Sequence, residues 1–244
     1  MQIYYKTDVG LMRRNNQDFC LCEKVSDDLA WAAVCDGMGG ANGGNVASSE
    51  ACKEMSRVLS EELKPDMNDG DLEQLMEKAV VSANTKVYEM SCFDDSLSGM
   101  GTTVELAVVS SGTLHIVHAG DSRVYRITSD MIDQITTDHS LVQQLVELGQ
   151  ITQEEARFHP SKNYITRALG VEPTLETDYF AVPFNKGDIV LMCTDGLSNY
   201  FSNEELLEAV RAIKEKEEIA QGLVDIAKEC GGSDNITVAI LINE

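Results

Sequence analysis

The chain has 244 residues, and its 41 Asp and Glu against 19 Lys and Arg give a formal net charge of −22. A surface this acidic repels phosphate backbones and anionic lipid, which argues against nucleic-acid binding and membrane association. No stretch approaches the ~20 apolar residues of a membrane span, and the first residues lack the basic-then-apolar pattern of a signal peptide, so we expect a cytoplasmic protein.

The predicted elements follow in chain order. Strands rich in aromatic, β-branched and cysteine residues are expected at 2–7, 19–24 and 29–35, followed by helices at 46–64 and 71–90. Three strands with short turns between them then predict an antiparallel meander; they are 104–109, 113–119 and 123–127. The remaining expected elements are a helical stretch 139–158, a strand 188–193, helices 203–214 and 216–229, and a final strand 235–242.

Long helices thus alternate with groups of hairpin strands, which favours antiparallel sheets covered by helices over a doubly wound parallel fold. No linker, repeat or low-complexity tract interrupts the pattern, so we predict a single domain over residues 1–244.

Seven cysteines are present, and the odd number without any CxxC pair predicts reduced, mostly buried thiols rather than a disulfide framework or a zinc site. The histidines give no metal pair either, because His115 and His118 fall on opposite faces of their strand. His139 and His159 flank the helical stretch and are candidates to reach a cleft.

Five aspartates stand at the edges of apolar strands: Asp18, Asp36, Asp121, Asp195 and Asp234. A carboxylate at the end of a buried strand must be hydrated, paired or bound to a cation. For any single one of them a plain Asp-Gly turn is an alternative explanation. Five together would repel strongly, and hard cations such as Mg²⁺ or Mn²⁺, which prefer oxygen ligands, relieve that repulsion.

Several other chemistries are excluded by spacing. The chain has no GxxxxGK[ST] phosphate loop, no HExxH and no GxSxG. No cysteine has an arginine six positions later, so the loop of a cysteine-nucleophile phosphatase is missing.

An ordered set of sequence blocks runs from Thr7 to Leu241: TDVGLMRRNNQDF, AVCDGMGGANGG, GMGTTVELAVV, AGDSRVYR, DHSLVQQLVELGQIT, HPSKNYITRALG, LMCTDGLSN and GGSDNITVAIL. Together these blocks resemble a known family, the type 2C, metal-dependent (PPM) protein serine/threonine phosphatases in their compact bacterial form. The resemblance implies an α+β fold, a four-layer α-β-β-α sandwich of two antiparallel sheets flanked by helices, with a flap at about 140–163 beside the active site.

The resemblance also implies roles for individual residues. Asp36 would bridge two Mn²⁺ or Mg²⁺ ions, with the Gly37 carbonyl on the second ion and Asp195 and Asp234 on the first. Asp18 would act through bound waters, and Asp121 would share a third, weaker metal site with Asp195. Arg13 matches the phosphate-binding arginine of the family; without the resemblance, an exposed turn cation would be the preferred interpretation.

Two positions depart from the family pattern. Gln17 stands where many members have a glutamate, and an amide orders water without adding charge. Met38 stands where eukaryotic members often have a histidine proposed as the leaving-group acid, and methionine cannot donate a proton, so the source of that proton stays open.

The implied reaction is hydrolysis of phosphoserine and phosphothreonine monoesters by a metal-activated water that bridges the two ions. The expected partners are phosphorylated proteins made by a bacterial serine/threonine kinase, without nucleic acid or membrane, and the chain is expected to be monomeric. Two alternatives remain: a scaffold protein that kept the fold and lost catalysis, which the complete set of aspartates argues against, and a phosphatase specialised for one regulator.

Overall fold

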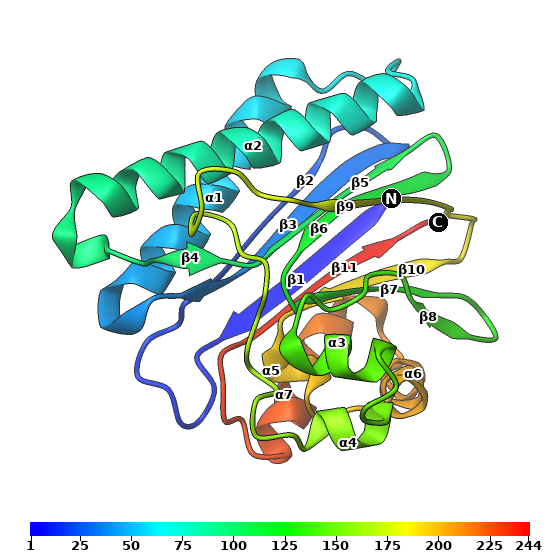
Figure 1. The fold of residues 1–244 in the computed structure, drawn as a ribbon. Helices are drawn as coiled ribbons and strands as arrows, with labels where there is room; N and C mark the ends of the chain where they lie inside the picture. The colour runs from blue at the N-terminus through cyan, green and yellow to red at the C-terminus, as the bar shows by residue number, and fades with distance from the viewer.

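The computed structural model describes the backbone of residues 1–244 and all side chains except those of residues 40–42. Its strands form two antiparallel sheets (Figure 1). The first sheet contains, in spatial order, β1 (Gln2–Asp8), β11 (Ile236–Ile242), β10 (Ile189–Cys193), β7 (Arg123–Ile127) and β8 (Ile132–Gln134). The second contains β2 (Asp18–Lys24), β3 (Leu29–Met38), β5 (Val104–Ser110), β6 (Thr113–Ala119) and β9 (Asp178–Pro183), with the short β4 (Gly101–Thr102) paired to β3.

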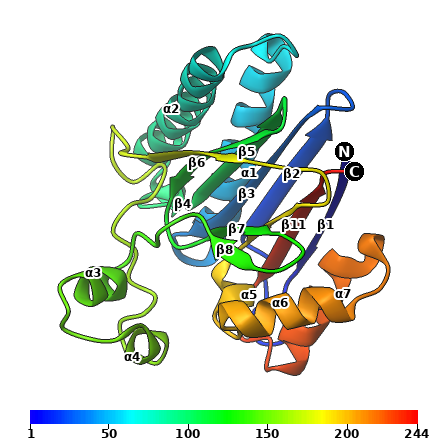
Figure 2. The same cartoon turned by 90° about the vertical axis from the view of Figure 1, so that its right-hand side faces the viewer.

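Helices cover the outer face of each sheet, as the two views show (Figures 1 and 2). The second sheet is covered by α1 (Gly40–Glu62) and α2 (Asp69–Phe93), which continue into the 3-10 turn η1 (Asp95–Leu97). The first sheet is covered by α5 (Asp195–Ser198), α6 (Asn203–Ala212) and α7 (Ile219–Glu229), with the 3-10 turn η2 (Lys216–Glu218) before α7. The predicted four-layer α-β-β-α sandwich is therefore confirmed.

The apolar strands are buried on both faces, which explains why they lack an alternating polar pattern. In β3, Trp31 and Cys35 pack against α1 and α2, whereas Ala32 and Val34 pack into the core between the sheets. Small residues such as Ala32 on the inner face let the two sheets approach closely.

The structure corrects the predicted meander. β5 and β6 pair as expected, but the next strand, β7, leaves that sheet and pairs with β10 and β8 in the other one. The turn at residues 120–122 therefore crosses from one sheet to the other. A short turn between two strands shows that they are close and cannot show that they share a sheet.

The predicted helix at 139–158 is also corrected, because the stretch forms two short helices, α3 (Leu141–Glu147) and α4 (Gln153–Arg157). Gly149 has a positive φ of 67° that ends the first helix, and Thr152 and Glu155 form a capping box that begins the second. Both helices project to one side of the sandwich in Figure 2. The flap predicted at about 140–163 falls on this segment.

Three further features complete the fold. Strands β4, β8 and β9 were not predicted; they are short or only half-buried and carry a weak apolar signal. All seven cysteines are free, as expected, with Cys20, Cys35, Cys52 and Cys193 buried and Cys92 and Cys230 exposed. None of the described helices has the length and apolar content needed to cross a bilayer.

Candidate metal centre

The five aspartates come from strand ends that meet at one edge of the sandwich. Asp18 begins β2 and lies directly opposite Asp36 near the end of β3 in the antiparallel register. Asp195 follows β10, and Asp234 precedes β11, the strand paired with β10. Asp121 lies in the turn that carries the chain between the two sheets. Antiparallel neighbours place the end of one strand beside the start of the next, so the five acids converge although they are far apart in sequence.

Close backbone packing holds these strand ends together. A side chain added at Gly196 would lie 1.8 Å from the carbonyl oxygen of Asn235, so α5 begins directly against the loop that carries Asp234. Gly37 is equally constrained, because its Cβ would lie 2.0 Å from the carbonyl oxygen of Gly44. Only glycine fits at these two positions.

The cavity at this edge has a volume of about 520 Å³, and four of the five aspartates line it together with Arg13, the candidate phosphate ligand. Its described lining residues are Arg13, Arg14, Asn15, Gln17, Asp36, Gly37, Met38, Gly39, Thr103, Asp121, Asn163, Ile165, Asp195, Asp234 and Asn235. Asp18 is buried behind this lining, where Thr194 Oγ1 donates a 2.8 Å hydrogen bond to its Oδ2.

The electrostatics of the cluster are unfavourable without a cation. Burial and then repulsion from Asp195 and Asp234 raise the pKa of Asp18 to about 7. Burial and Asp234 raise the pKa of Asp195 to about 6. Burial and neighbouring carboxylates also raise the pKa of Asp36, with Asp18 the largest of them, and that of Asp121, with Asp195 the largest.

Two carboxylate oxygens in this cluster are buried without a hydrogen-bond partner, Asp18 Oδ1 and Asp195 Oδ1. A buried, partnerless carboxylate oxygen is costly unless a cation or water completes its shell. Mg²⁺ and Mn²⁺ prefer carboxylate and water oxygens as ligands, which is the donor set that these aspartates offer. The residues present therefore fit divalent cations.

Arg13 reaches the cavity from the loop between β1 and β2. Its Nη2 donates a 2.7 Å hydrogen bond to Asp234 Oδ2, and about half of its side chain is exposed. The sequence did not reveal this ion pair. It holds the Arg13 guanidinium against Asp234 at the mouth of the cavity.

Sequence reasoning missed Asn235. Its Nδ2 donates to the carbonyl oxygens of Val9 and Asn15, and its Oδ1 accepts from the Gln17 backbone N–H at 2.8 Å. Asn235 therefore fixes the loop that carries Arg13 to the loop that carries Asp234. The only sequence signal for Asn235 was its position directly after Asp234, and an ordinary turn residue could stand at the same position.

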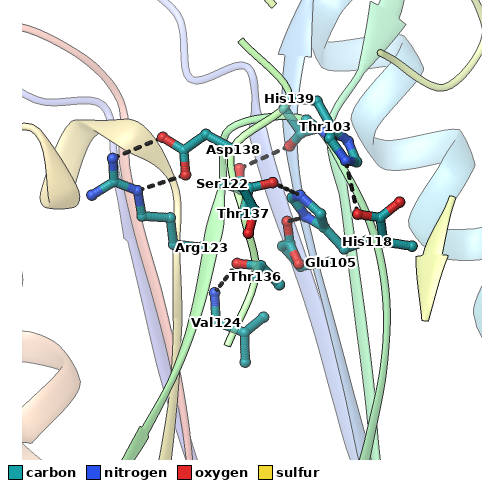
Figure 3. A network of polar contacts seen from close by, with 12 residues as sticks. Thr103, Glu105, His118, Ser122, Arg123, Val124, Thr136, Thr137, Asp138 and His139 are labelled. Atoms are coloured by element: carbon teal, nitrogen blue, oxygen red, sulfur yellow. Dashed lines mark hydrogen bonds and ion pairs between the residues drawn. The ribbon is translucent and has the colours of Figure 1, made fainter. Parts of the chain in front are cut away.

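The two candidate histidines do not line this cavity. His159 is half-buried in the segment predicted as the flap, where its Nδ1 accepts a hydrogen bond from the Ser161 backbone N–H. His139 is buried behind the turn that carries Asp121 and contacts His118 (Figure 3). Neither one is among the described residues that line the cavity with the aspartates.

Comparisons with known proteins agree with this geometry. Residues 13–226 match the sequence profile of the family described as Protein phosphatase 2C. The chain is 36% identical over 248 residues to the serine/threonine phosphatase stp of Listeria innocua, covering 99% of this chain and 95% of that protein. The S. agalactiae serine/threonine phosphatase superposes with a TM-score of 0.90 and 34% identity, covering 100% of this chain and 99% of the other.

A third comparison is with the catalytic domain of the serine/threonine protein phosphatase PstP in complex with two manganese ions. It superposes with a TM-score of 0.84 and 35% identity, covering 98% of this chain and 96% of that one. The family profile matches most of the chain, and relatives above 30% identity align along almost its whole length. The chain belongs to the protein phosphatase 2C family and is a metal-dependent protein serine/threonine phosphatase.

Proposed function

We propose that the chain hydrolyses phosphoserine and phosphothreonine in the cavity described above, with the five aspartates holding divalent cations and Arg13 holding the phosphate. The observation that carries the proposal is the convergence of five carboxylates at one edge of the sandwich, two of them with buried, partnerless oxygens. Sequence and structural relatives are named serine/threonine phosphatases, which agrees with this reaction.

The family and the two manganese ions of the PstP structure support two Mn²⁺ or Mg²⁺ ions in this site. Asp36 is assigned to both ions, the Gly37 carbonyl to the second, and Asp195 and Asp234 to the first. Asp18, buried behind them, is assigned to the water shell, and Asp121 with Asp195 to a third, weaker site. When bound, the ions supply positive charge for the phosphate and a nucleophilic hydroxide near neutral pH.

Arg13 is assigned to the phosphate because a guanidinium offers a planar fork of donors that matches two phosphate oxygens. Asn235 assists by fixing the backbone of the loop that carries Arg13. Met38 lines the cavity and has no proton to give, so the chain supplies no side-chain acid at that position for the leaving oxygen.

A covalent phosphoenzyme is not part of the proposal. None of the described residues that line the catalytic cavity is a cysteine or a histidine, and the buried thiols Cys20 and Cys52 have a raised pKa, Cys20 through its contact with Cys22 and burial, and Cys52 through burial. A thiol kept protonated is a poor nucleophile. Direct attack by water is the route that this lining supports.

The substrates are phosphorylated proteins. We infer further that a bacterial serine/threonine kinase produces them in the cytoplasm, that the chain acts on them as a monomer, and that it forms one domain with the flap at about 140–163 beside the site. The alternative of a scaffold without catalysis is disfavoured because the set of aspartates is complete.

The test combines turnover with metal binding. Phosphate release from a phosphothreonine peptide should require Mn²⁺, stop on chelation and resume when the ion is restored. Calorimetric titration of Mn²⁺ should show that Asp36→Asn lowers the affinity by at least tenfold and abolishes turnover, whereas Asp95→Asn, an exposed control in η1, changes neither. Turnover of the Asp36→Asn variant at the wild-type rate and low Mn²⁺ would exclude the assignment.

A further inference from the structure

A chain of buried polar side chains runs between the second sheet and the base of the flap (Figure 3). Glu105 on β5 and His118 on β6 are cross-strand partners, both fully buried, and His118 Nδ1 contacts Glu105 Oε1. Burial alone would lower the pKa of His118, but Glu105 outweighs it and the pKa is raised. His118 Nε2 donates to the Thr137 carbonyl oxygen at 2.9 Å, and its ring packs on His139 with centroids 4.4 Å apart.

His139 is bonded to three other segments of the chain. Its backbone N–H donates to the Gly120 carbonyl oxygen at 2.6 Å, and the Gly120 N–H donates back to His139 Nδ1 at 3.2 Å. Its carbonyl oxygen accepts from the Thr166 N–H at 2.7 Å, and its Nε2 lies 3.2 Å from Asp178 Oδ2 on β9. His139 thus joins the turn before Asp121, both ends of the flap, and the edge strand of the sheet.

The Gly120 contact determines where a neutral ring carries its proton. Nδ1 accepts a hydrogen bond from a backbone N–H, so the single proton is on Nε2, which lies 3.2 Å from Asp178 Oδ2 and 3.0 Å from Arg167 Nη1. Burial, with His118 and Arg167 next, lowers the pKa of His139, which agrees with a neutral ring.

The turn that His139 contacts, residues 120–122, is also tightly packed on its other side. Gly120 has a φ of 127°, and a Cβ there would lie 2.6 Å from the side chain of Thr103. Thr103 Oγ1 in turn contacts Ser122 Oγ at 2.9 Å and accepts from the Asp36 backbone N–H at 2.9 Å. Gly120, Asp121 and Ser122 are therefore held between His139 on one side and Thr103, which also contacts Asp36, on the other.

We propose that His139 is a positioning residue: its imidazole fixes the turn that carries Asp121 and, through the same residue, both ends of the flap. The inference rests on the proposed function of the site, because Asp121 matters to turnover only if that cavity is catalytic. His139 itself does not line the cavity and acts through Gly120.

Two variants at position 139 separate this role from packing. In His139→Asn the amide oxygen takes the place of Nδ1 and keeps the Gly120 contact. In His139→Gln the amide reaches toward Asp178, and the acceptor for Gly120 is lost. The matched control is His115→Gln, which removes another buried imidazole, one that lies on β6 and whose Nδ1 is 2.7 Å from the Tyr179 hydroxyl oxygen.

We expect His139→Gln to lower kcat for a phosphothreonine peptide at least tenfold and to raise hydrogen exchange in peptides covering residues 117–123 and 164–168. His139→Asn should stay within about threefold of wild type in both measurements. His115→Gln should lower the Tm yet leave kcat and exchange in those peptides unchanged.

Equal losses in His139→Asn and His139→Gln, or an equal loss in His115→Gln, would overturn the assignment to the Gly120 contact. If wild-type protein showed no metal-dependent turnover, the proposed function would fail. The exchange pattern would still report on whether His139 holds the turn and the flap ends.

Discussion

Asp18 is buried against Thr194, and its Oδ1 has no hydrogen-bond partner. A carboxylate in that position destabilises the fold unless a cation or a water completes its shell. The cost appears as a raised pKa of about 7, against an ordinary value of 3.8. Because the folded-state pKa lies above the unfolded one, ionisation of Asp18 destabilises the metal-free fold, and the penalty grows as the pH rises from about 4 to 7.

The first prediction follows from this destabilising effect of ionised Asp18 in the metal-free fold. In EDTA at pH 8, Asp18→Asn should be more stable than wild type by about 1–3 kcal/mol, because an amide keeps the Thr194 contact without a buried charge. The advantage should shrink toward pH 4 and reverse when saturating Mn²⁺ stabilises the wild type. Melting curves in EDTA and in Mn²⁺ across this pH range measure it. A lower Tm for the variant in EDTA at pH 8 would contradict the prediction.

Arg13 carries the second prediction. Its guanidinium lies at the mouth of the cavity and is bonded to Asp234, so its loss should weaken phosphate binding more than metal binding. Charge-assisted hydrogen bonds contribute about 1.5–3 kcal/mol, so Arg13→Ala should raise the inhibition constant of inorganic phosphate by roughly 10- to 100-fold.

The control for that variant is the neighbouring Arg14→Ala, which removes a charge from the same cavity. It should raise the inhibition constant much less, because Arg14 has no bond to a residue of the acid cluster. Equal effects of the two variants would show that general positive charge, and not the Arg13 fork, holds the phosphate.

Helices α1 and α2 are joined by a buried carboxylate. Glu54 on α1 accepts from Arg57 of the same helix and from Ser82 Oγ on α2, while Lys86 of α2 lies 3.6 Å away. Arg57 and Ser82 together lower the pKa of Glu54 to about 2 from an ordinary 4.5. The group therefore stabilises the fold above pH 4.5, and that contribution is lost as the pH falls through 2.

The third prediction concerns this contact between the helices. Glu54→Gln should destabilise the protein by about 1–2 kcal/mol at pH 7, and the difference from wild type should vanish as the pH falls from 4.5 toward 2. Glu62→Gln, which removes the exposed ion pair to Lys78 between the same helices, should cost well under 1 kcal/mol at any pH. Urea unfolding of both variants at several pH values tests the contrast.

At the same scale, the elements show which parts of the fold the sequence could predict. Strands such as β3 and β11 are apolar on both faces, so composition alone identifies them. The crossing of the chain from β6 to β7 was missed, because the three-residue turn at 120–122 has the same sequence signal within a sheet and between sheets. Gly149 could be identified as a helix stop from the sequence, and its positive φ ends the first of the two short helices, whereas the second helix that begins after it was not predicted separately.

In the site, as in the fold, local sequence signals could be recognised and contacts between distant segments could not. The five aspartates were found because each stands at the edge of an apolar strand, which is a local signal, and the resemblance to the family supplied their common role. The Arg13–Asp234 pair joins residues 221 positions apart, and the grip of His139 on Gly120 depends on the crossing turn. No local pattern contains either contact, so both needed the structure.

The net charge of −22 concerns the whole molecule, because a chain with 41 acidic side chains must accept an anionic phosphorylated site on its substrate. A second cavity of about 490 Å³ adjoins the catalytic one between the flap and α6 and shares Asp121 and Asp195 with it. The exposed Glu154 and Glu204 line it, one on each side. Arg123, Arg157 and Lys162 line the same cavity, but its acidic side chains outnumber these three, so residues of a substrate next to the phosphorylated position would meet a net negative lining.

The last prediction is therefore a preference for basic residues beside the phosphosite. At low salt, kcat/KM should be several-fold higher for a phosphothreonine peptide with flanking lysines than for one with flanking glutamates. The gap should close between 0.1 and 1 M NaCl, as the Debye length falls from about 10 Å to about 3 Å. The double variant Glu154→Gln and Glu204→Gln should narrow the gap at low salt, whereas Glu217→Gln and Glu218→Gln, an equal charge change on η2, should not. Equal rates on both peptides, without any salt effect, would mean that the acidic surface serves solubility and not substrate choice.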